Sequence, residues 1–93
     1  MDRGEQIANE LISIVDERGR EYGDVTRNFQ RIASLWTAYM HNSGRQVVIN
    51  HKDVAPLMML LKLARMQNPN SKDDYDTLLD ICGYAVCQAR LTE

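Results

Sequence analysis

Apolar residues recur along most of this chain at the three- and four-residue spacing of amphipathic helices. The first helix is predicted to start after Asp2, a suitable N-cap, and to bend or stop near Gly19 and Gly23. A second helix is predicted to follow Asp24, with an apolar face made of Val25, Phe29, Ile32, Leu35, Trp36 and Tyr39. Because this face holds the only Trp and the only Phe, it is expected to form the centre of the core.

The helical pattern breaks over HNSGRQVVIN and again over QNPNSKDD, which predicts two loops. Between them a third helix is predicted, capped by Asn50 and tolerating Pro56 in its first turns. This helix is apolar almost all round, which predicts burial on more than one side, as at a subunit interface. The fourth helix is expected from about Asp73 to Leu91, with Ser71 and Asp74 resembling a capping box.

Four helices in antiparallel order predict an all-α, bundle-like fold, and residues 1–93 are expected to form a single helical domain. A domain of this size buries only about 60% of the surface that its unfolded chain exposes. Yet 44% of the residues are apolar, a surplus that is more easily covered between subunits than left in water. The bundle is therefore predicted to be completed by oligomerisation, which makes the chain a homo-oligomer, a dimer or higher.

Charge and composition narrow the function classes and the partners. A net charge of −2 disfavours a module that binds duplex nucleic acid. No apolar run approaches the roughly 20 residues that span a bilayer, so no membrane partner is expected. Cys82 and Cys87 would lie about 7.5 Å apart along one helix axis, too far for a disulfide. Two reduced cysteines and the absence of a signal peptide fit the cytoplasm of a bacterial host cell.

The first group of polar residues that helix patterning does not explain is Arg18, Tyr22 and Asn28, around Gly23 and Asp24. One interpretation is a helix–helix corner, in which the glycine turns the backbone and the aspartate caps. The other is a pocket at the bend. An Arg fork suits a phosphate, and a Tyr ring can stack on a nucleotide base.

The second group is Lys62 and Arg65 on the third helix. Because Lys62 is surrounded by apolar residues in MMLLKLARM, it must snorkel, pair with a carboxylate or meet an anionic ligand. Pairing with a carboxylate of the fourth helix is the default interpretation.

The third group is Asp76, Asp80 and Tyr84, which share one face of the fourth helix at i, i+4 and i+8. Asp80 is expected to form an ion pair with Lys62 or Arg65. Alternatively, Asp76 and Asp80 hold Mg²⁺ through water and act as a catalytic pair. A glycine-rich phosphate loop, paired-cysteine metal spacing and a His-x-x-x-His pattern are absent from the sequence.

Five motifs together resemble a family of small, uncharacterised phage and prophage proteins. They are Tyr22–Asp24, Asn28–Phe29, Ile32–Trp36, the Lys62–Arg65 helix and Asp80–Ala85, and the resemblance covers most of residues 16–90. Their order is similar to that in phage nucleotide-modification-associated domains and, more distantly, in MazG-like all-α nucleotide pyrophosphatases. The resemblance implies an oligomeric helical fold with a nucleotide site between helices. The metal-binding acidic pairs of MazG-like enzymes are not matched in register, since Glu17 and Glu21 lie four apart and the third helix offers only Asp53.

Three functional hypotheses follow from the residues and the resemblance. In the first, a nucleotide-binding phage protein, which could have pyrophosphatase activity, uses Arg18, Lys62 and Arg65 on phosphates and Tyr22 or Tyr84 on the base. Asp76 and Asp80 would then hold Mg²⁺. In the second, a non-catalytic oligomer sequesters a nucleotide or a nucleotide-derived signal without a metal. In the third, the apolar third helix docks a host protein, and the polar groups are structural ion pairs.

Overall fold

The computed structural model describes residues 1–68, 70 and 73–92, apart from the side chains of Glu21 and Tyr22. It confirms the predicted all-α, bundle-like fold. The described residues form four helices and no strand: α1 (Arg3–Tyr22), α2 (Val25–Asn42), α3 (His51–Met66) and α4 (Tyr75–Ala89).

The helix starts follow from local capping chemistry. The Asp2 carboxylate accepts a hydrogen bond from the backbone N–H of Glu5, and the Asp24 carboxylate accepts one from that of Thr26. Asn50 forms a full capping box, because Asp53 at the third position accepts a bond from the Asn50 backbone N–H at 2.9 Å. These three predicted caps are confirmed. The N-cap of α4 is Asp74, whereas its predicted partner Ser71 lies outside the described residues.

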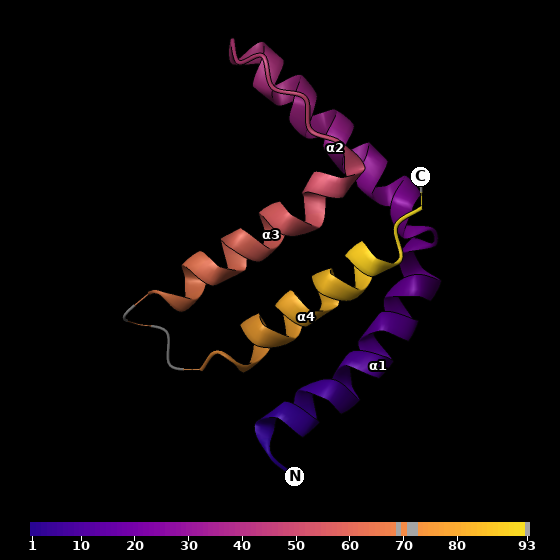
Figure 1. Cartoon of the computed structure of the whole chain (residues 1–93), viewed down its shortest axis with the longest axis vertical. Helices are drawn as coiled ribbons and strands as arrows, with labels where there is room; N and C mark the ends of the chain where they lie inside the picture. The colour runs from indigo at the N-terminus through magenta and orange to yellow at the C-terminus, as the bar shows by residue number, and fades with distance from the viewer. Residues whose placement is uncertain (69, 71–72, 93) are drawn as a thin grey trace.

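Helix α4 is the central element of the fold, with α3 along one side and α1 along the other (Figure 1). Gly23 separates α1 from α2 with φ 71°, a left-handed value that glycine adopts without strain. After this corner α2 turns away from α4 and packs on the N-terminal part of α3 (Figure 1). Three helices therefore form a layer, and α2 projects from one end of it.

The buried core is small and lies where α2 crosses α3. Its fully packed members are Phe29 and Ala33 from α2 and Val54 and Ala55 from α3, while Leu79 of α4 is buried nearby. The sequence predicted that the whole apolar face of α2 would be central, and this is wrong for Leu35 and Tyr39, whereas Trp36 packs against the core. Leu35 and Tyr39 are 70% and 65% exposed.

The chain is more open than a compact domain of its size. Its radius of gyration is 15.1 Å, whereas about 12 Å is typical for 93 residues. Its principal extents are 48 × 34 × 18 Å, those of a flat, elongated molecule. None of the helices in the described part of the chain is long and apolar enough to cross a membrane.

Candidate ligand-binding cleft

A cleft of about 530 Å³ opens where α1, α2 and α4 converge beside the core. Its volume lies within the usual range of small-molecule sites, roughly 300–1,000 Å³. Apolar and aromatic side chains make up most of its wall: Ile14, Val15, Val25, Phe29, Ile32, Trp36, Val54, Met58 and Leu79. The cleft therefore offers a largely apolar slot in which an aromatic ring or an aliphatic group could be buried.

Four of the residues predicted from the sequence line this one cleft: Arg18 from α1, Asn28 from α2, and Asp80 and Tyr84 from α4. The corner at Gly23 brings the first two together, because it folds the end of α1 back toward the start of α2. The two interpretations of this segment, a helix–helix corner and a pocket at the bend, are thus compatible. Asp24 caps α2 there, and Gly23 itself lines the cleft.

Lys62 and Asp80 form an ion pair at the side of the cleft. Lys62 Nζ lies 3.0 Å from Asp80 Oδ2, and the two side chains are 14% and 33% exposed. The default interpretation of Lys62, a carboxylate partner on the fourth helix, is confirmed. Lys62 does not line the cleft itself. It contacts Asp80, which does.

The other predicted site residues are placed elsewhere or are not described. Arg65 and Asp76 are exposed and lie outside the lining of the cleft. The backbone of Tyr22 ends α1, but its side chain lies outside the described residues. The structure thus brings together Arg18, Asn28, Asp80 and Tyr84 and leaves Arg65 and Asp76 apart from them.

Positive charge gathers at one end of the cleft. Cys87 lines the cleft, and its burial raises the pKa of its thiol above the ordinary value, while Arg18 and Arg90 oppose that shift electrostatically. A guanidinium group from α1 and one from the C-cap of α4 therefore act on the same half-buried sulfur. Both arginines also line the cleft, so an anionic group entering at this end would meet both of them.

The acidic residues that the structure describes do not fit a metal site held by the protein alone. No group of three or more His, Cys, Asp or Glu side chains comes together among the described residues. Asp80, one of the two predicted ligands, already faces the ammonium group of Lys62. Because a cation in contact with this carboxylate competes with Mg²⁺ for it, Asp80 is poorly suited to hold a metal ion.

Three glycines contribute open space to the cleft. Gly19, Gly23 and Gly83 line it, and a Cβ atom added at any of them would meet no other atom within 4 Å. Gly19 and Gly83 lie within helices, where alanine would favour the helix by about 1 kcal/mol. Side-chain-free positions facing a cleft leave room for a ligand to approach the backbone.

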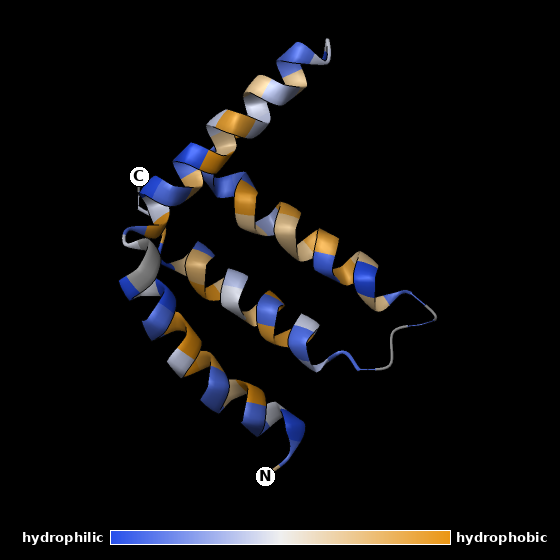
Figure 2. Ribbon diagram, turned by 180° about the vertical axis from the view of Figure 1, so that it is seen from behind, coloured by the Kyte–Doolittle hydropathy of each residue, from blue (hydrophilic) through white to orange (hydrophobic). Residues whose placement is uncertain are grey.

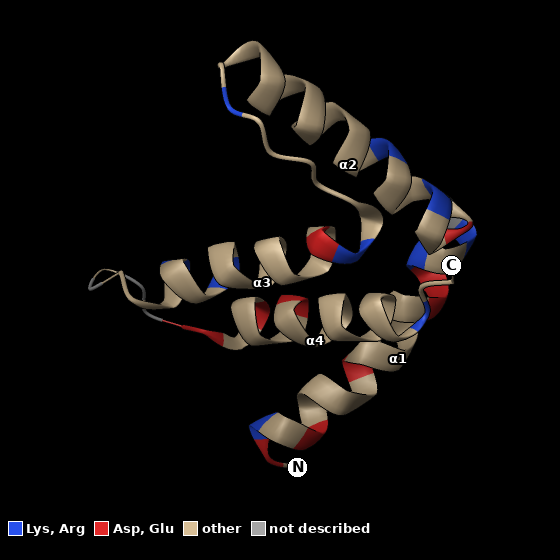
Figure 3. Ribbon diagram, turned by 45° about the horizontal axis from the view of Figure 1, so that its top comes forward, with Lys and Arg blue, Asp and Glu red and all other residues tan. Residues whose placement is uncertain are grey.

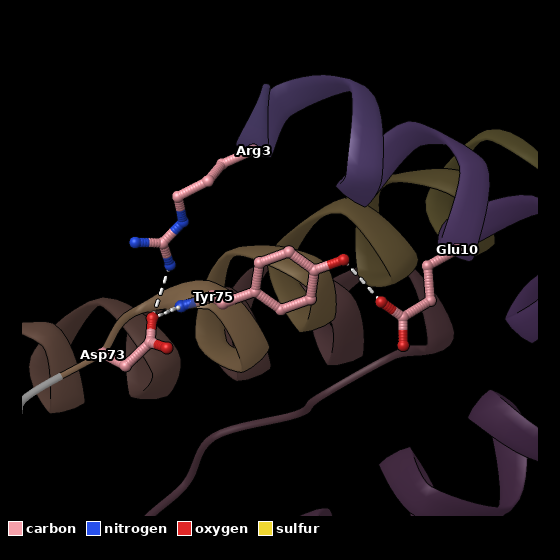
Figure 4. A network of polar contacts seen from close by, with 4 residues as sticks. All are labelled: Arg3, Glu10, Asp73 and Tyr75. Carbon is pink, nitrogen blue, oxygen red and sulfur yellow. Dashed lines mark hydrogen bonds and ion pairs between the residues drawn. The ribbon is translucent and has the colours of Figure 1, made fainter. Parts of the chain in front are cut away.

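A second polar cluster lies away from the cleft, at the other end of α4, and joins it to α1 (Figure 4). Arg3 pairs with Asp73, and the hydroxyl of Tyr75 donates a hydrogen bond to Glu10. The backbone N–H of Tyr75 and the guanidinium of Arg3 lower the pKa of Asp73, and the bond to Glu10 raises the pKa of Tyr75. All four residues are at the surface. Because the cluster joins α1 to the start of α4, we call it the α1–α4 clasp.

Arg90 and Gly83 are among the cleft residues that the sequence did not indicate as functional candidates. A helical spacing signal was available for both. Asp80, Gly83 and Cys87 follow one another at three- and four-residue steps along α4, and Arg90 comes three residues later. Continuing the Asp80, Gly83, Cys87 series by one more three-residue step would have reached the arginine.

Comparison with known proteins shows which family this chain belongs to. Residues 6–92 match the model of a family described as a domain of unknown function, DUF6378, and the chain belongs to this family. It is 44% identical over 79 residues to the Gene 55 protein of Mycobacterium phage L5, which covers 84% of this chain and 45% of that protein. It is 38% identical over 77 residues to the Gene 55 protein of Mycobacterium phage D29, covering 83% and 46%.

The chain therefore spans about half the length of the curated relatives that it matches. No solved structure matches it. The predicted resemblance to a phage protein family is confirmed, whereas the more distant similarity to MazG-like enzymes stays a prediction.

Proposed function

We propose that this domain binds a nucleotide or a nucleotide-derived small molecule in the cleft between α1, α2 and α4. The observation that carries the proposal is the combination of two guanidinium groups, Arg18 and Arg90, with an aromatic and apolar slot in a single cleft. A nucleotide has the matching halves. Its phosphates suit an Arg fork, and its base suits a slot bordered by Trp36 and Tyr84.

Binding without turnover is the form of this proposal that the geometry favours over a pyrophosphatase. Catalysis by a MazG-like route needs carboxylates free to hold Mg²⁺, whereas Asp80 is paired with Lys62 and Asp76 is exposed outside the cleft. Sequestration needs no such group. In this proposal Asn28 orients the ligand through its amide, which can both donate and accept hydrogen bonds.

The test is the thermal stability of the purified domain against a panel of nucleotides and cyclic nucleotides, with and without Mg²⁺. A ligand that binds the native state must raise the melting temperature by mass action. We expect a shift that persists in a chelator and that is lost in R18M. The matched control is R20M, because Arg20 is exposed and pairs with Asp16 outside the cleft. No shift across the panel would overturn the proposal, and a shift with product release in Mg²⁺ would replace sequestration by hydrolysis.

A glycine substitution separates loss of binding from loss of folding. G83A adds a methyl group that meets no protein atom within 4 Å and increases helix propensity. The variant should therefore unfold at a higher temperature by itself, yet show a smaller ligand-induced shift, because the methyl group takes up cleft space. A G83A variant that is more stable and binds the same nucleotide unchanged would place the ligand elsewhere.

The rest of the predicted setting belongs to the same proposal. We expect a cytoplasmic site of action, where both described cysteines stay reduced as the structure has them. We also expect a homo-oligomer, because the extended monomer leaves many large apolar side chains exposed.

A further inference from the structure

The outward side of α3 carries an exposed leucine face, which consists of Leu57, Leu60, Leu61 and Leu63. Their exposed fractions are 41, 61, 49 and 46%. The opposite side of the same helix is used inside the molecule, where Val54 and Ala55 are buried and Lys62 pairs with Asp80. The helix is thus apolar on both sides, and only one side is covered by this chain.

The leucine face is continuous with a second apolar surface. Val47 and Val48 of the segment before α3 are 45% and 75% exposed, and they line a shallow hollow together with Leu57. The six side chains expose on the order of 500 Å², toward the upper end of what a monomer usually shows in one patch. A standard interface takes about 800 Å² from each partner, so this patch supplies most of one half.

The leucine face carries no charge. From Val54 to Ala64, a stretch that the structure describes completely, Lys62 is the one charged residue, and it points inward to Asp80. Most of α3 is accordingly tan in Figure 3 and orange in Figure 2. In a two-fold contact each residue near the axis meets its own copy, so a charge there would repel itself. A face without charges avoids this repulsion.

We infer that this face is the seam of a homodimer, in which α3 of one chain packs on α3 of a second copy about a two-fold axis near Leu60 and Leu61. Leu57, Leu60, Leu61 and Ala64 have the three- and four-residue spacing of a helix-pairing stripe. The open shape of the monomer leaves the outward side of α3 available for such a contact. Its radius of gyration of 15.1 Å and its few buried residues leave α3 uncovered in every copy. A second copy is the partner that is always present at matching concentration.

The test compares two leucines with similar exposure on different helices. Leu60 is 61% exposed on the leucine face, and Leu35 is 70% exposed on α2. In sedimentation equilibrium the wild-type domain should have twice the chain mass of 10.7 kDa at micromolar concentration. L60E should shift the mass to that of one chain, whereas L35E should leave the dimer intact. A monomeric wild type at about 100 µM would overturn the inference and favour a different protein as the occupant of this face.

A second measurement covers the case in which L60E cannot fold as a monomer. Under mild oxidation L60C should form an intermolecular disulfide, because the axis brings residue 60 of one copy close to residue 60 of the other. L35C and the wild type contain the same native cysteines, and they should not cross-link. Cross-linking of L35C with none of L60C would move the interface to α2 and overturn the seam. Nucleotide-induced shifts in L60E report on the cleft separately, since Leu60 does not line it.

Discussion

Two cation–carboxylate pairs tie α4 to its neighbours in different surroundings: one lies just before its first residue, and the other lies within the helix. At the N-terminal end Arg3 pairs with Asp73, and these side chains are 61% and 67% exposed. Further along the helix Lys62 pairs with Asp80, and there the values are 14% and 33%. The same chemistry is thus solvated just before the helix and half-buried within it.

The surroundings decide what each pair contributes. An exposed pair is screened by water and salt, so it can orient two helices but adds little stability. A half-buried cation needs its partner, because an uncompensated charge among apolar side chains is costly. The cleft with Arg18, Tyr84 and Arg90 is also lined by Asp80, the carboxylate of the half-buried pair. We infer that the clasp fixes where α1 lies and that the Lys62–Asp80 pair supports the cleft wall.

The largest expected effect comes from breaking the Lys62–Asp80 pair on one side only. D80N leaves the ammonium group of Lys62 without its carboxylate, and we expect the free energy of unfolding to fall by about 2 kcal/mol. In K62M/D80N both charges are gone, so most of that loss should be recovered. Urea unfolding of the two single variants and the double variant gives the coupling energy of the pair.

The matched control for this cycle is the clasp pair, through R3M, D73N and their combination. These exposed residues should show a much smaller coupling than Lys62 and Asp80. If D73N proved as costly as D80N, burial would not distinguish the two pairs. A D80N variant that kept its stability but lost a metal-dependent activity would instead support the catalytic role predicted for Asp80.

The parts of the structure that the sequence predicted are those set by local chemistry. Asp2, Asp24 and Asn50 cap helices because their short polar side chains, placed directly before an apolar stripe, accept hydrogen bonds from N–H groups of the first turn. The Lys62–Asp80 pair was accessible for a related reason. A cation within a stretch of apolar residues requires an anionic partner, and Asp80 lies beside the buried stripe of the next helix.

The parts that the sequence did not predict depend on how helices cross. The apolar face of α2 has a regular period up to Tyr39, yet Leu35 and Tyr39 are exposed while Trp36 packs against the core. Periodicity defines which face is apolar and says nothing of how much of it a neighbour covers. For Arg90 the spacing along α4 was readable, but whether that side of the helix lines a cleft depends on how α1 lies against α4.

The next largest effect concerns Cys87, which lines the cleft together with Asp80. Burial raises the pKa of its thiol, so at a given pH a smaller fraction is thiolate than in a free cysteine. In a C82S background, alkylation of Cys87 should be several-fold slower than that of a model thiol, and its rate should rise with pH about a midpoint above the ordinary thiol value. The measurement is a series of labelling rates from pH 7 to 10.

A nucleotide that occupies the cleft should slow this labelling further, because Cys87 lines the cleft wall. C87S provides the reference in which Cys82 alone is followed. A labelling midpoint at or below the ordinary thiol value would mean that the two arginines outweigh burial at this sulfur, contrary to the direction stated for its pKa.

The smallest expected effect is the pH dependence of the clasp. The pKa of Asp73 is lowered in the folded chain, so its contribution to stability is present above the ordinary aspartate value and is lost as the pH falls through the lowered one. The pKa of Tyr75 is raised, so its contribution is present below the ordinary tyrosine value and is lost as the pH rises through the raised one. The clasp should therefore act between roughly pH 4 and pH 10.

Melting temperatures of the wild type, D73N and Y75F across this range test that window. At neutral pH both variants should melt slightly below the wild type, by less than D80N does, and the difference should shrink in high salt because these groups are exposed. The D73N difference should vanish in acid, and the Y75F difference should vanish in alkali. A D73N difference that stayed the same below pH 3 would show that Asp73 acts through the backbone turn before Tyr75 and not through its charge.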